Sequence, residues 1–354
     1  MMRIVSVGRA LPEHRYEQAE ITAQLQSLLD VPDELRRRVD VLHERVRVGH
    51  RHLALPLEAY SDLATFGQAN NAWIRCAIDL GERAVNDALD RAGLGVKDVD
   101  IMFDVTVTGL ASPALDARLV NRMGLRTDMK RVPIFGLGCV AGVAGISRAV
   151  DYLKGHPNEV AVLLSVELCS LNLQRGDLST AAMISTGLFG DGAAAVVLVG
   201  EERARAMGLE APAVRTTRSV FYPDTEDIMG WDISENGFRI VLSEGVPRVA
   251  RENLGPDVTA FLAEHDLTPR DVASWVCHPG GPKVLEAMRD SLELTDDDVA
   301  LSWKVLAEQG NLSSTSVLMV LREVFDGRRP EPGDVGMLVA MGPGFCSEMI
   351  LVDW

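Results

Sequence analysis

Apolar runs alternate with amphipathic stretches along this chain. Mostly apolar segments occupy residues 100–109, 159–167, 193–200, 274–281 and 334–342. Their length and composition predict strands that are buried on both faces. The stretches between them carry apolar residues at helical spacing. The alternation therefore predicts an α/β fold with buried, largely apolar strands.

The pattern occurs twice. The helical stretch "ERAVNDALDRAG" leads into "LGVKDVDIMFDV", and "VTAFLAEH" leads into "DLTPRDVASWVCH". Further along, "LGCVAGVAGISRAVDYL" mirrors "QGNLSSTSVLMVLREVF" at nearly the same spacing, which sets Cys139 opposite Asn311. We infer two duplicated halves, residues 1–205 and 206–354, packed about a pseudo-twofold axis. Residues at equivalent turns would then face a shared site.

Composition and charge exclude several classes of protein. The chain has 354 residues, of which 47% are hydrophobic and 24% are charged, as in ordinary globular proteins. A net charge of −16 argues against nucleic acid or an anionic membrane as the main partner. The N-terminus lacks the apolar core of a signal peptide, and no stretch is built to span a bilayer. We therefore expect a cytoplasmic protein without a membrane span.

Five scattered cysteines form no C-x-x-C pair, so neither disulfides nor a zinc site is indicated. One of them, Cys139, lies in the glycine-rich segment "FGLGCVAGVAG". A lone intracellular cysteine is most often a small buried apolar residue. Here, however, glycines allow a sharp turn and a helical pattern follows directly. Because a helix N-terminus lowers a thiol pKa toward the thiolate, Cys139 is a candidate nucleophile.

Two polar residues lie in similar positions elsewhere. His278 follows a predicted strand, at the end where α/β sheets bind ligands. Asn311 follows a glycine, which is typical of a helix N-cap, but its place opposite Cys139 favours a role in the site. A thiolate can accept an acyl group from a thioester, while histidine and asparagine can donate hydrogen bonds to an enolate oxygen. This set suits decarboxylative Claisen condensation better than peptide hydrolysis.

Five motifs resemble those of type III polyketide synthases, the chalcone synthase-like branch of the thiolase superfamily. They are "GLGCVAG", "LFGDGAAAVVLVG", "HPGGPKVLE", "GNLSSTSVL" and "MGPGF", and the similarity runs over nearly the whole chain. The resemblance implies a five-layer αβαβα homodimer, an acyltransferase that uses acyl-CoA and malonyl-CoA with no cofactor and no metal. By motif, Cys139 would accept the acyl group. His278 and Asn311 would bind the malonyl thioester and stabilise its enolate.

The same resemblance assigns residues to the walls of the site. Phe189 matches the gatekeeper phenylalanine between the CoA tunnel and the cavity, and the turn Gly342-Pro343-Gly344 matches a loop that closes beside the nucleophile. The CoA-binding positions would be Arg45, Arg47, Arg51, Gly281 and Lys283. The remaining pocket positions would be Cys169, Asn172, Trp231, Ile240, Ser313 and Ser112, the last of which corresponds to a position that reaches the neighbouring subunit's site.

The segments "VELCSLNLQRGDLS", "RHLALPLEAY" and "MGWDIS" look most like bacterial members that use fatty acyl-CoA starters. A narrow apolar channel favours such starters, since each buried methylene contributes about 0.8 kcal/mol. We therefore expect iterative condensation of malonyl-CoA onto a fatty acyl group, followed by closure to an alkylpyrone or alkylresorcinol. Three alternatives stay open. The first is an aromatic product of the tetrahydroxynaphthalene type from malonyl-CoA alone, since Cys169 also resembles the enzymes that form such products. The second is a single ketoacyl synthase III-like condensation, and the third is a binding protein without catalysis.

Overall fold

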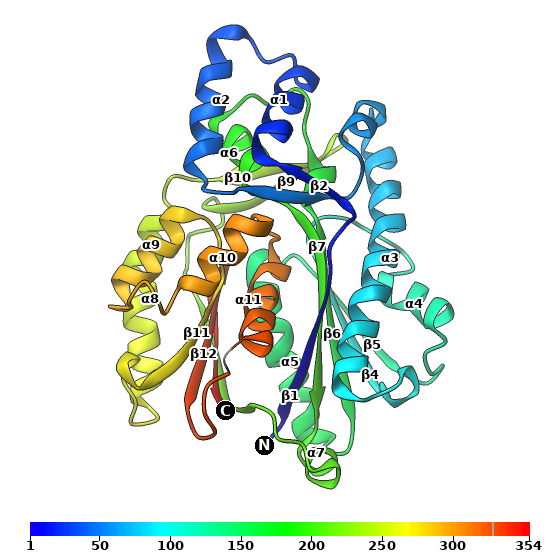
Figure 1. Cartoon of the computed structure of the whole chain (residues 1–354), viewed down its shortest axis with the longest axis vertical. Coiled ribbons are helices and arrows are strands. Elements are labelled where there is room, and N and C mark those ends of the chain that lie inside the picture. The colour runs from blue at the N-terminus through cyan, green and yellow to red at the C-terminus, as the bar shows by residue number, and fades with distance from the viewer. Residues whose placement is uncertain (328) are drawn as a thin grey trace.

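Helical and sheet layers alternate through the body of the molecule in the computed structural model, which describes residues 1–327 and 329–354. Figure 1 shows two layers of strands, with helices between them and on both outer sides. One outer layer contains α8 (Val246–Ala263) and α9 (Pro282–Ser291), the middle layer contains α5 (Ala141–Gly155) and α11 (Ser314–Asp326), and the other outer layer contains α3 (Phe66–Ala92) and α4 (Leu115–Met123). The predicted five-layer αβαβα fold is confirmed.

The strands of the two β layers follow the order β11-β12-β13-β8-β1-β7-β6-β4-β5. The first layer comprises β11 (Val272–Cys277), β12 (Val335–Gly342), β13 (Cys346–Asp353) and β8 (Ala213–Phe221). The second comprises β1 (Arg3–Ala10), β7 (Asp191–Val199), β6 (Val160–Leu168), β4 (Ile101–Thr106) and β5 (Lys130–Phe135). A single pair, Arg3 with Ala213, joins β1 to β8. The apolar runs predicted as strands are β4, β6, β7, β11 and β12.

Both layers repeat one pairing scheme, which confirms the duplication. β4 pairs parallel with β6, β6 pairs antiparallel with β7, and β7 pairs antiparallel with β1. Likewise β11 pairs parallel with β12, β12 pairs antiparallel with β13, and β13 pairs antiparallel with β8. The predicted boundary after residue 205 falls inside α7 (Glu201–Met207), which connects β7 to β8. The division into 1–205 and 206–354 stays a prediction.

The corner that leads into β4 in one half and into β11 in the other is also the same. A short 3-10 turn, η2 (Val96–Asp98) or η5 (Pro269–Asp271), precedes β4 or β11. In each turn an aspartate accepts a hydrogen bond from the backbone N–H three residues earlier. The distances are 2.9 Å from Gly95 N to Asp98 Oδ2 and 2.7 Å from Thr268 N to Asp271 Oδ2. Asp98 and Asp271 therefore make the same local contact in the two halves.

Smaller elements cover one end of the layered body (Figure 1). They are β2 (His14–Glu17), α1 (Gln18–Leu28), α2 (Asp33–Arg45), β3 (His50–Leu53), α6 (Thr180–Leu188), β9 (Met229–Ser234) and β10 (Gly237–Leu242). Near them α10 (Ala300–Gln309) leads toward α11. Buried His43 ties this cap together, because its ring nitrogens lie 2.8 Å from Thr22 Oγ1 and 3.0 Å from the carbonyl oxygen of Met183. This capped end holds the cavities described below.

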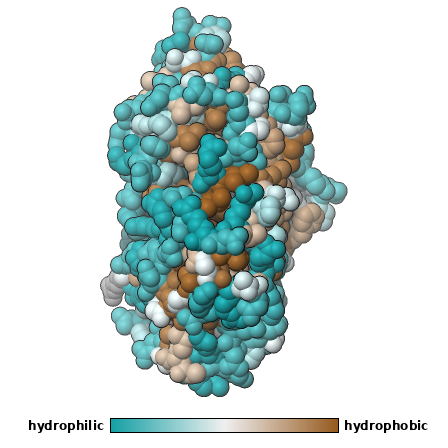
Figure 2. Space-filling view, turned by 90° about the vertical axis from the view of Figure 1, so that its right-hand side faces the viewer, coloured by the Kyte–Doolittle hydropathy of each residue, from teal (hydrophilic) through white to brown (hydrophobic). Residues whose placement is uncertain are grey.

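The surface mixes polar and apolar side chains. Figure 2 shows the face that carries α3 and α4, where apolar patches lie between mostly hydrophilic residues. No helix in the described part of the chain is long and apolar enough to cross a membrane.

Candidate active site

A cavity of about 480 Å³ at the capped end brings together the three residues predicted to carry the chemistry. Cys139 lies in η3 (Gly138–Val140), directly before α5. His278 follows β11, and Asn311 lies in the turn before α11. All three side chains line this cavity and are buried. Two helices of the middle layer and one strand therefore converge on a single site, as the duplication predicts.

The turn that carries Cys139 needs glycine. Gly138 has a φ of +56°, and a Cβ there would lie 2.6 Å from Cδ of Pro343. A Cβ on Gly342 would lie 2.8 Å from the carbonyl oxygen of Leu137. The loop Gly342-Pro343-Gly344 thus packs directly against the turn that carries Cys139.

The ionisation of Cys139 differs from the sequence prediction. Burial raises the pKa of the Cys139 thiol to about 12, although its hydrogen bond to Ser313 Oγ, 3.7 Å away, acts in the opposite direction. The helix N-terminus was expected to lower the pKa. Removal of the charged form from water outweighs that effect. The thiol is therefore neutral in this closed site and must lose its proton when it attacks.

His278 is a neutral imidazole, since burial lowers its pKa to about 3. Its backbone N–H donates to the carbonyl oxygen of Val339 at 2.9 Å, which holds the residue at the end of β11. Neither Nδ1 nor Nε2 has a hydrogen-bond partner among the described residues. Buried polar atoms are normally paired, so a free pair of ring nitrogens indicates a place for substrate. A neutral imidazole offers one donor and one acceptor there.

Asn311 is held by both ends of its amide. Its Oδ1 accepts a hydrogen bond from Ser313 N at 2.8 Å, and Nδ2 donates to the carbonyl oxygen of Gly280 at 3.1 Å. Since α11 begins at Ser314 and its N-cap is Ser313, Asn311 does not cap the helix. An amide nitrogen carries two N–H groups, so one donor remains after the contact with Gly280.

Glu167, which the motifs did not single out, connects the end of β6 to the start of α11. Its Oε2 accepts hydrogen bonds from Thr108 Oγ1 at 2.8 Å and Val107 N at 3.1 Å, and its Oε1 accepts one from Ser314 Oγ. Burial raises the pKa of this carboxyl group, while these donors lower it. A charged residue within an otherwise apolar strand pattern was the available signal.

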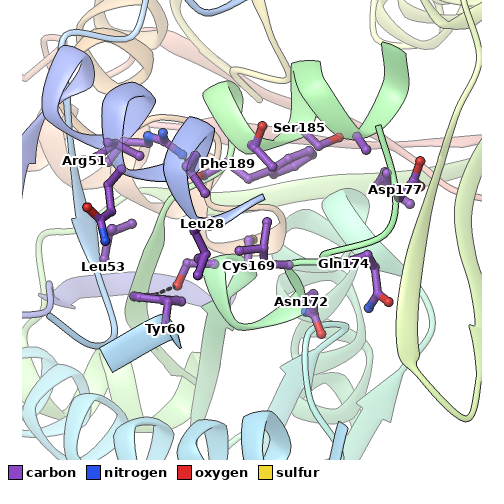
Figure 3. Close-up of a pocket in the computed structure, with 18 of the residues that line it drawn as sticks. Leu28, Arg51, Leu53, Tyr60, Cys169, Asn172, Gln174, Asp177, Ser185 and Phe189 are labelled. Carbon is purple, nitrogen blue, oxygen red and sulfur yellow. Dashed lines mark hydrogen bonds between the residues drawn. The ribbon is translucent and has the colours of Figure 1, made fainter. Parts of the chain in front are cut away.

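A second, smaller cavity of about 90 Å³ lies beyond Phe189, which lines both cavities. Figure 3 shows Cys169, Asn172, Tyr60 and Leu28 around it. Trp231 and Ile240 also line it, and they are directly paired across β9 and β10. The sequence thus predicted one wall of this cavity but missed the wall formed by Tyr60, Ser185 and the leucines of α1.

The five predicted CoA-binding residues lie in three places. Arg45, Gly281 and Lys283 line the first cavity. Arg47 is exposed, and its guanidinium lies 5.1 Å from the centre of the Trp303 ring and 3.5 Å from Glu286 Oε1. The group near the first cavity therefore supplies cations where a CoA phosphate could bind.

Two other predicted residues lie elsewhere. Arg51 is only 2% exposed and donates through Nη1 to the carbonyl oxygen of Phe189 at 2.5 Å. The alternation of β3 directs this side chain inward, so the predicted contact with a CoA phosphate does not fit. Ser112 is exposed and does not line either cavity.

This fold, with cysteine, histidine and asparagine facing one cavity, is that of a thiolase-type condensing enzyme. Residues 72–264 match the family described as FAE1/type III polyketide synthase-like protein, and residues 213–353 match the C-terminal domain of chalcone and stilbene synthases. The chain belongs to the type III polyketide synthase family. It is an acyltransferase, and members of this family use CoA thioesters as substrates and need no further cofactor.

Individual relatives agree with this assignment. The chain is 52% identical to a 1,3,6,8-tetrahydroxynaphthalene synthase of Streptomyces peucetius subsp. caesius, over 99% of this chain and 93% of the relative. It is 31% identical to a putative chalcone synthase of Bacillus subtilis (strain 168), over 100% and 99% of the two chains. The solved structure of 1,3,6,8-tetrahydroxynaphthalene synthase from Streptomyces coelicolor A3(2) matches with a TM-score of 0.91 and 31% identity, over 99% of each chain.

Proposed function

We propose that this enzyme condenses malonyl-CoA units alone and forms an aromatic product of the tetrahydroxynaphthalene type. The observation that carries the proposal is the 52% identity, over 99% of this chain, to a 1,3,6,8-tetrahydroxynaphthalene synthase. Sequence patterns alone favour a fatty acyl starter and leave this product as an alternative. The second cavity is small, and its largely apolar wall also carries the polar groups of Cys169, Asn172 and Ser185. These polar groups can bind carbonyl oxygens of a short poly-β-keto chain.

Loading begins at Cys139. The sulfur attacks the thioester carbonyl, and the thiol proton passes to the neutral ring of His278. A new carbon–sulfur bond to Sγ forms while the bond to the CoA sulfur breaks, and CoA leaves as the thiol after it takes up that proton. Burial favours this sequence over a resting thiolate, since both Cys139 and His278 are uncharged before the substrate arrives.

Extension uses the hydrogen-bond donors opposite Cys139. A second malonyl-CoA loses CO₂, and the electron pair of the broken bond forms an enolate whose oxygen accepts hydrogen bonds from His278 and Asn311 Nδ2. The enolate carbon attacks the acyl group on Cys139, a carbon–carbon bond forms, and Sγ leaves as a thiolate while the extended chain stays on CoA. For the next round this thiolate attacks the thioester of the extended chain, and the CoA thiolate leaves and takes up a proton. Arg45 and Lys283 hold the CoA phosphates at the first cavity. Phe189 stands where the growing chain passes into the second cavity.

The test is the product profile of the purified protein with labelled malonyl-CoA, alone and with acyl-CoAs of increasing length. An aromatic pentaketide formed from malonyl-CoA alone is the expected result. A fatty acyl starter is the second candidate, because Leu25, Leu28, Leu53 and Leu57 give the second cavity an apolar wall. Pyrones or resorcinols that require a long acyl-CoA would overturn the proposal and support that candidate.

We also propose that the enzyme is a homodimer in the cytoplasm. Large apolar side chains stay exposed on the single chain, including Leu110 at 42%, Phe135 at 45% and Phe221 at 59%. Sedimentation at micromolar concentration is expected to give twice the mass of one chain, and a monomer would refute the assembly.

A further inference from the structure

A positive charge is buried against the wall of the second cavity, whereas the other cations, Arg45 and Lys283, line the first. Arg51 comes from β3, lines this cavity, and points its guanidinium toward Phe189 (Figure 3). Burial lowers the pKa of Arg51 to about 10, while nearby Asp191 raises it, so the group is protonated at neutral pH. A buried cation needs partners for each of its donors, because an unpaired one loses its hydration without compensation.

Two of the three guanidinium nitrogens have partners. Nε donates to Gln18 Oε1 at 3.1 Å, and Nη1 donates to the carbonyl oxygen of Phe189 at 2.5 Å. Gln18 is itself oriented, since its Nε2 donates to the carbonyl oxygen of Gly187 at 2.8 Å. The aliphatic stem of Arg51 packs under the turn before Asn311, where a Cβ on Gly310 would lie 3.1 Å from Arg51 Cδ. The guanidinium is therefore held at a defined place between the gatekeeper and the catalytic turn.

The third nitrogen, Nη2, is buried and has no hydrogen-bond partner in the described part of the chain. The carboxylate near it is already engaged. Asp191 Oδ2 accepts from Ala54 N at 2.6 Å and from Ser170 Oγ, and Oδ1 accepts from Ser170 N at 2.9 Å. Asp191 thus balances the charge of Arg51 without a hydrogen bond to it, and Nη2, with both of its N–H groups, remains unpaired in a residue that lines the second cavity.

We propose that Nη2 of Arg51 binds a carbonyl or enolate oxygen of the growing poly-β-keto chain and so determines how far the chain extends before it closes into a ring. The ligand class is a 1,3-dicarbonyl, whose enolate places negative charge on oxygen. Charge-assisted hydrogen bonds to such an oxygen are strong where water is excluded. The inference rests on the proposed function for the chemistry of the chain, and it assigns to Arg51 a contact with substrate that the catalytic residues do not make.

The first experiment compares Arg51→Met and Arg51→Lys with the wild-type enzyme. The readouts are the ratio of full-length aromatic product to short tri- and tetraketide lactones, and the rate of malonyl-CoA decarboxylation. We expect Arg51→Met to lower the ratio about tenfold or more, since it removes a charged hydrogen bond, with decarboxylation within about twofold of wild type. Arg51→Lys keeps the charge but not the planar set of guanidinium donors, so its product ratio is expected to lie between those of Arg51→Met and the wild-type enzyme.

Arg203→Met is the matched control, because Arg203 pairs with Asp98 on the surface and its loss changes the net charge equally. A folded Arg51→Met enzyme with the wild-type ratio would overturn the proposal. If this variant does not fold, Arg51→Met/Asp191→Asn removes the buried charge pair together and is judged by the same ratio. If wild type makes product only with an acyl starter, the proposed substrate fails, whereas the ratio measured with that starter still decides the role of Arg51.

A second measurement does not depend on any variant. Acetylacetone, a small 1,3-diketone, is titrated into wild-type enzyme whose first cavity is filled with CoA. We expect its enolate absorbance to appear at least about one pH unit lower than in free solution, because a nearby cation favours the charged form. An unchanged titration curve would contradict the proposed contact.

Discussion

At the scale of single residues, the site combines a neutral thiol with a neutral imidazole. Burial raises the pKa of Cys139 to about 12 and lowers that of His278 to about 3. Both shifts disfavour charge, so the substrate meets an uncharged pair. The hydrogen-bond donors for the enolate, on His278 and Asn311, do not depend on the thiol. Decarboxylation therefore does not need the thiol, although acyl transfer uses His278 as well.

This separation predicts the behaviour of Cys139→Ala. The variant should form no condensation product, because no sulfur is present to hold the acyl group. Release of labelled CO₂ from malonyl-CoA should continue, since His278 and Asn311 are unchanged. His278→Ala is the comparison and is expected to lose decarboxylation as well. Normal product from Cys139→Ala would refute the role of the nucleophile.

A larger side chain at position 240 should shorten the ketide product. Ile240 lines the second cavity, and a phenylalanine there would take up part of its volume of about 90 Å³. Ile240→Phe should therefore shift products toward shorter ketides, as measured by mass spectrometry of the product mixture. Ile233→Phe on the same β-hairpin is the control, because Ile233 is 55% exposed. An unchanged product length in Ile240→Phe would mean that the chain grows elsewhere.

At the scale of elements, the close contact of α5 with α11 places the catalytic residues. The two helices begin beside Cys139 and Asn311, respectively, so their separation sets the distance across the first cavity. Gly142 lies at this contact. A Cβ there would lie 2.7 Å from Val317 Cγ1 and would collide with the carbonyl oxygen of Ser314. Glycine is therefore required at position 142 because a side chain would not fit between α5 and α11.

Gly142→Ala should lower the free energy of unfolding by about 1–3 kcal/mol through overpacking. Gly155→Ala lies at the other end of α5, where a Cβ would meet nothing within 4 Å, and it should be neutral or slightly stabilising. Urea unfolding of both variants measures the difference. Equal stability of the two variants would show that the helices can separate without cost.

At the scale of the whole molecule, the buried histidine of the cap makes stability depend on pH. Burial lowers the pKa of His43 from 6.5 to about 4. Between these values the unfolded chain binds a proton that the folded chain does not bind. His43 therefore favours the folded state fully above pH 6.5, and that contribution is lost as pH falls toward 4.

His43→Gln should remove this dependence. Between pH 7 and pH 4 the wild-type protein is expected to lose about 3 kcal/mol of unfolding free energy relative to the variant. Urea unfolding at a series of pH values measures this difference. His265→Gln, the same change at a partly exposed histidine, serves as the control for the substitution itself. A constant offset between wild type and His43→Gln would show that His43 titrates alike in both states.

Local sequence patterns determined much of this protein. The apolar runs specified β4, β6, β7, β11 and β12, because a strand buried on both faces requires consecutive apolar residues. The repeated helix-turn-strand segments specified the duplication and set Cys139 opposite Asn311. The end of a predicted strand indicated His278, and the motifs added the family. Each of these signals is contained in a short stretch of chain, so no knowledge of distant contacts was needed.

Only the tertiary structure decided the ionisation of the site and the place of Arg51. Whether Cys139 is a thiol or a thiolate depends on desolvation by segments far away in sequence, and this outweighed the local effect of the helix end. Arg51 reads as one of several arginines in a basic stretch, but the pairing of β3 turns its side chain toward Phe189. The walls of the second cavity come from α1, β3, α6 and the β9–β10 hairpin. Their packing, which no single segment encodes, decides which chain can grow inside.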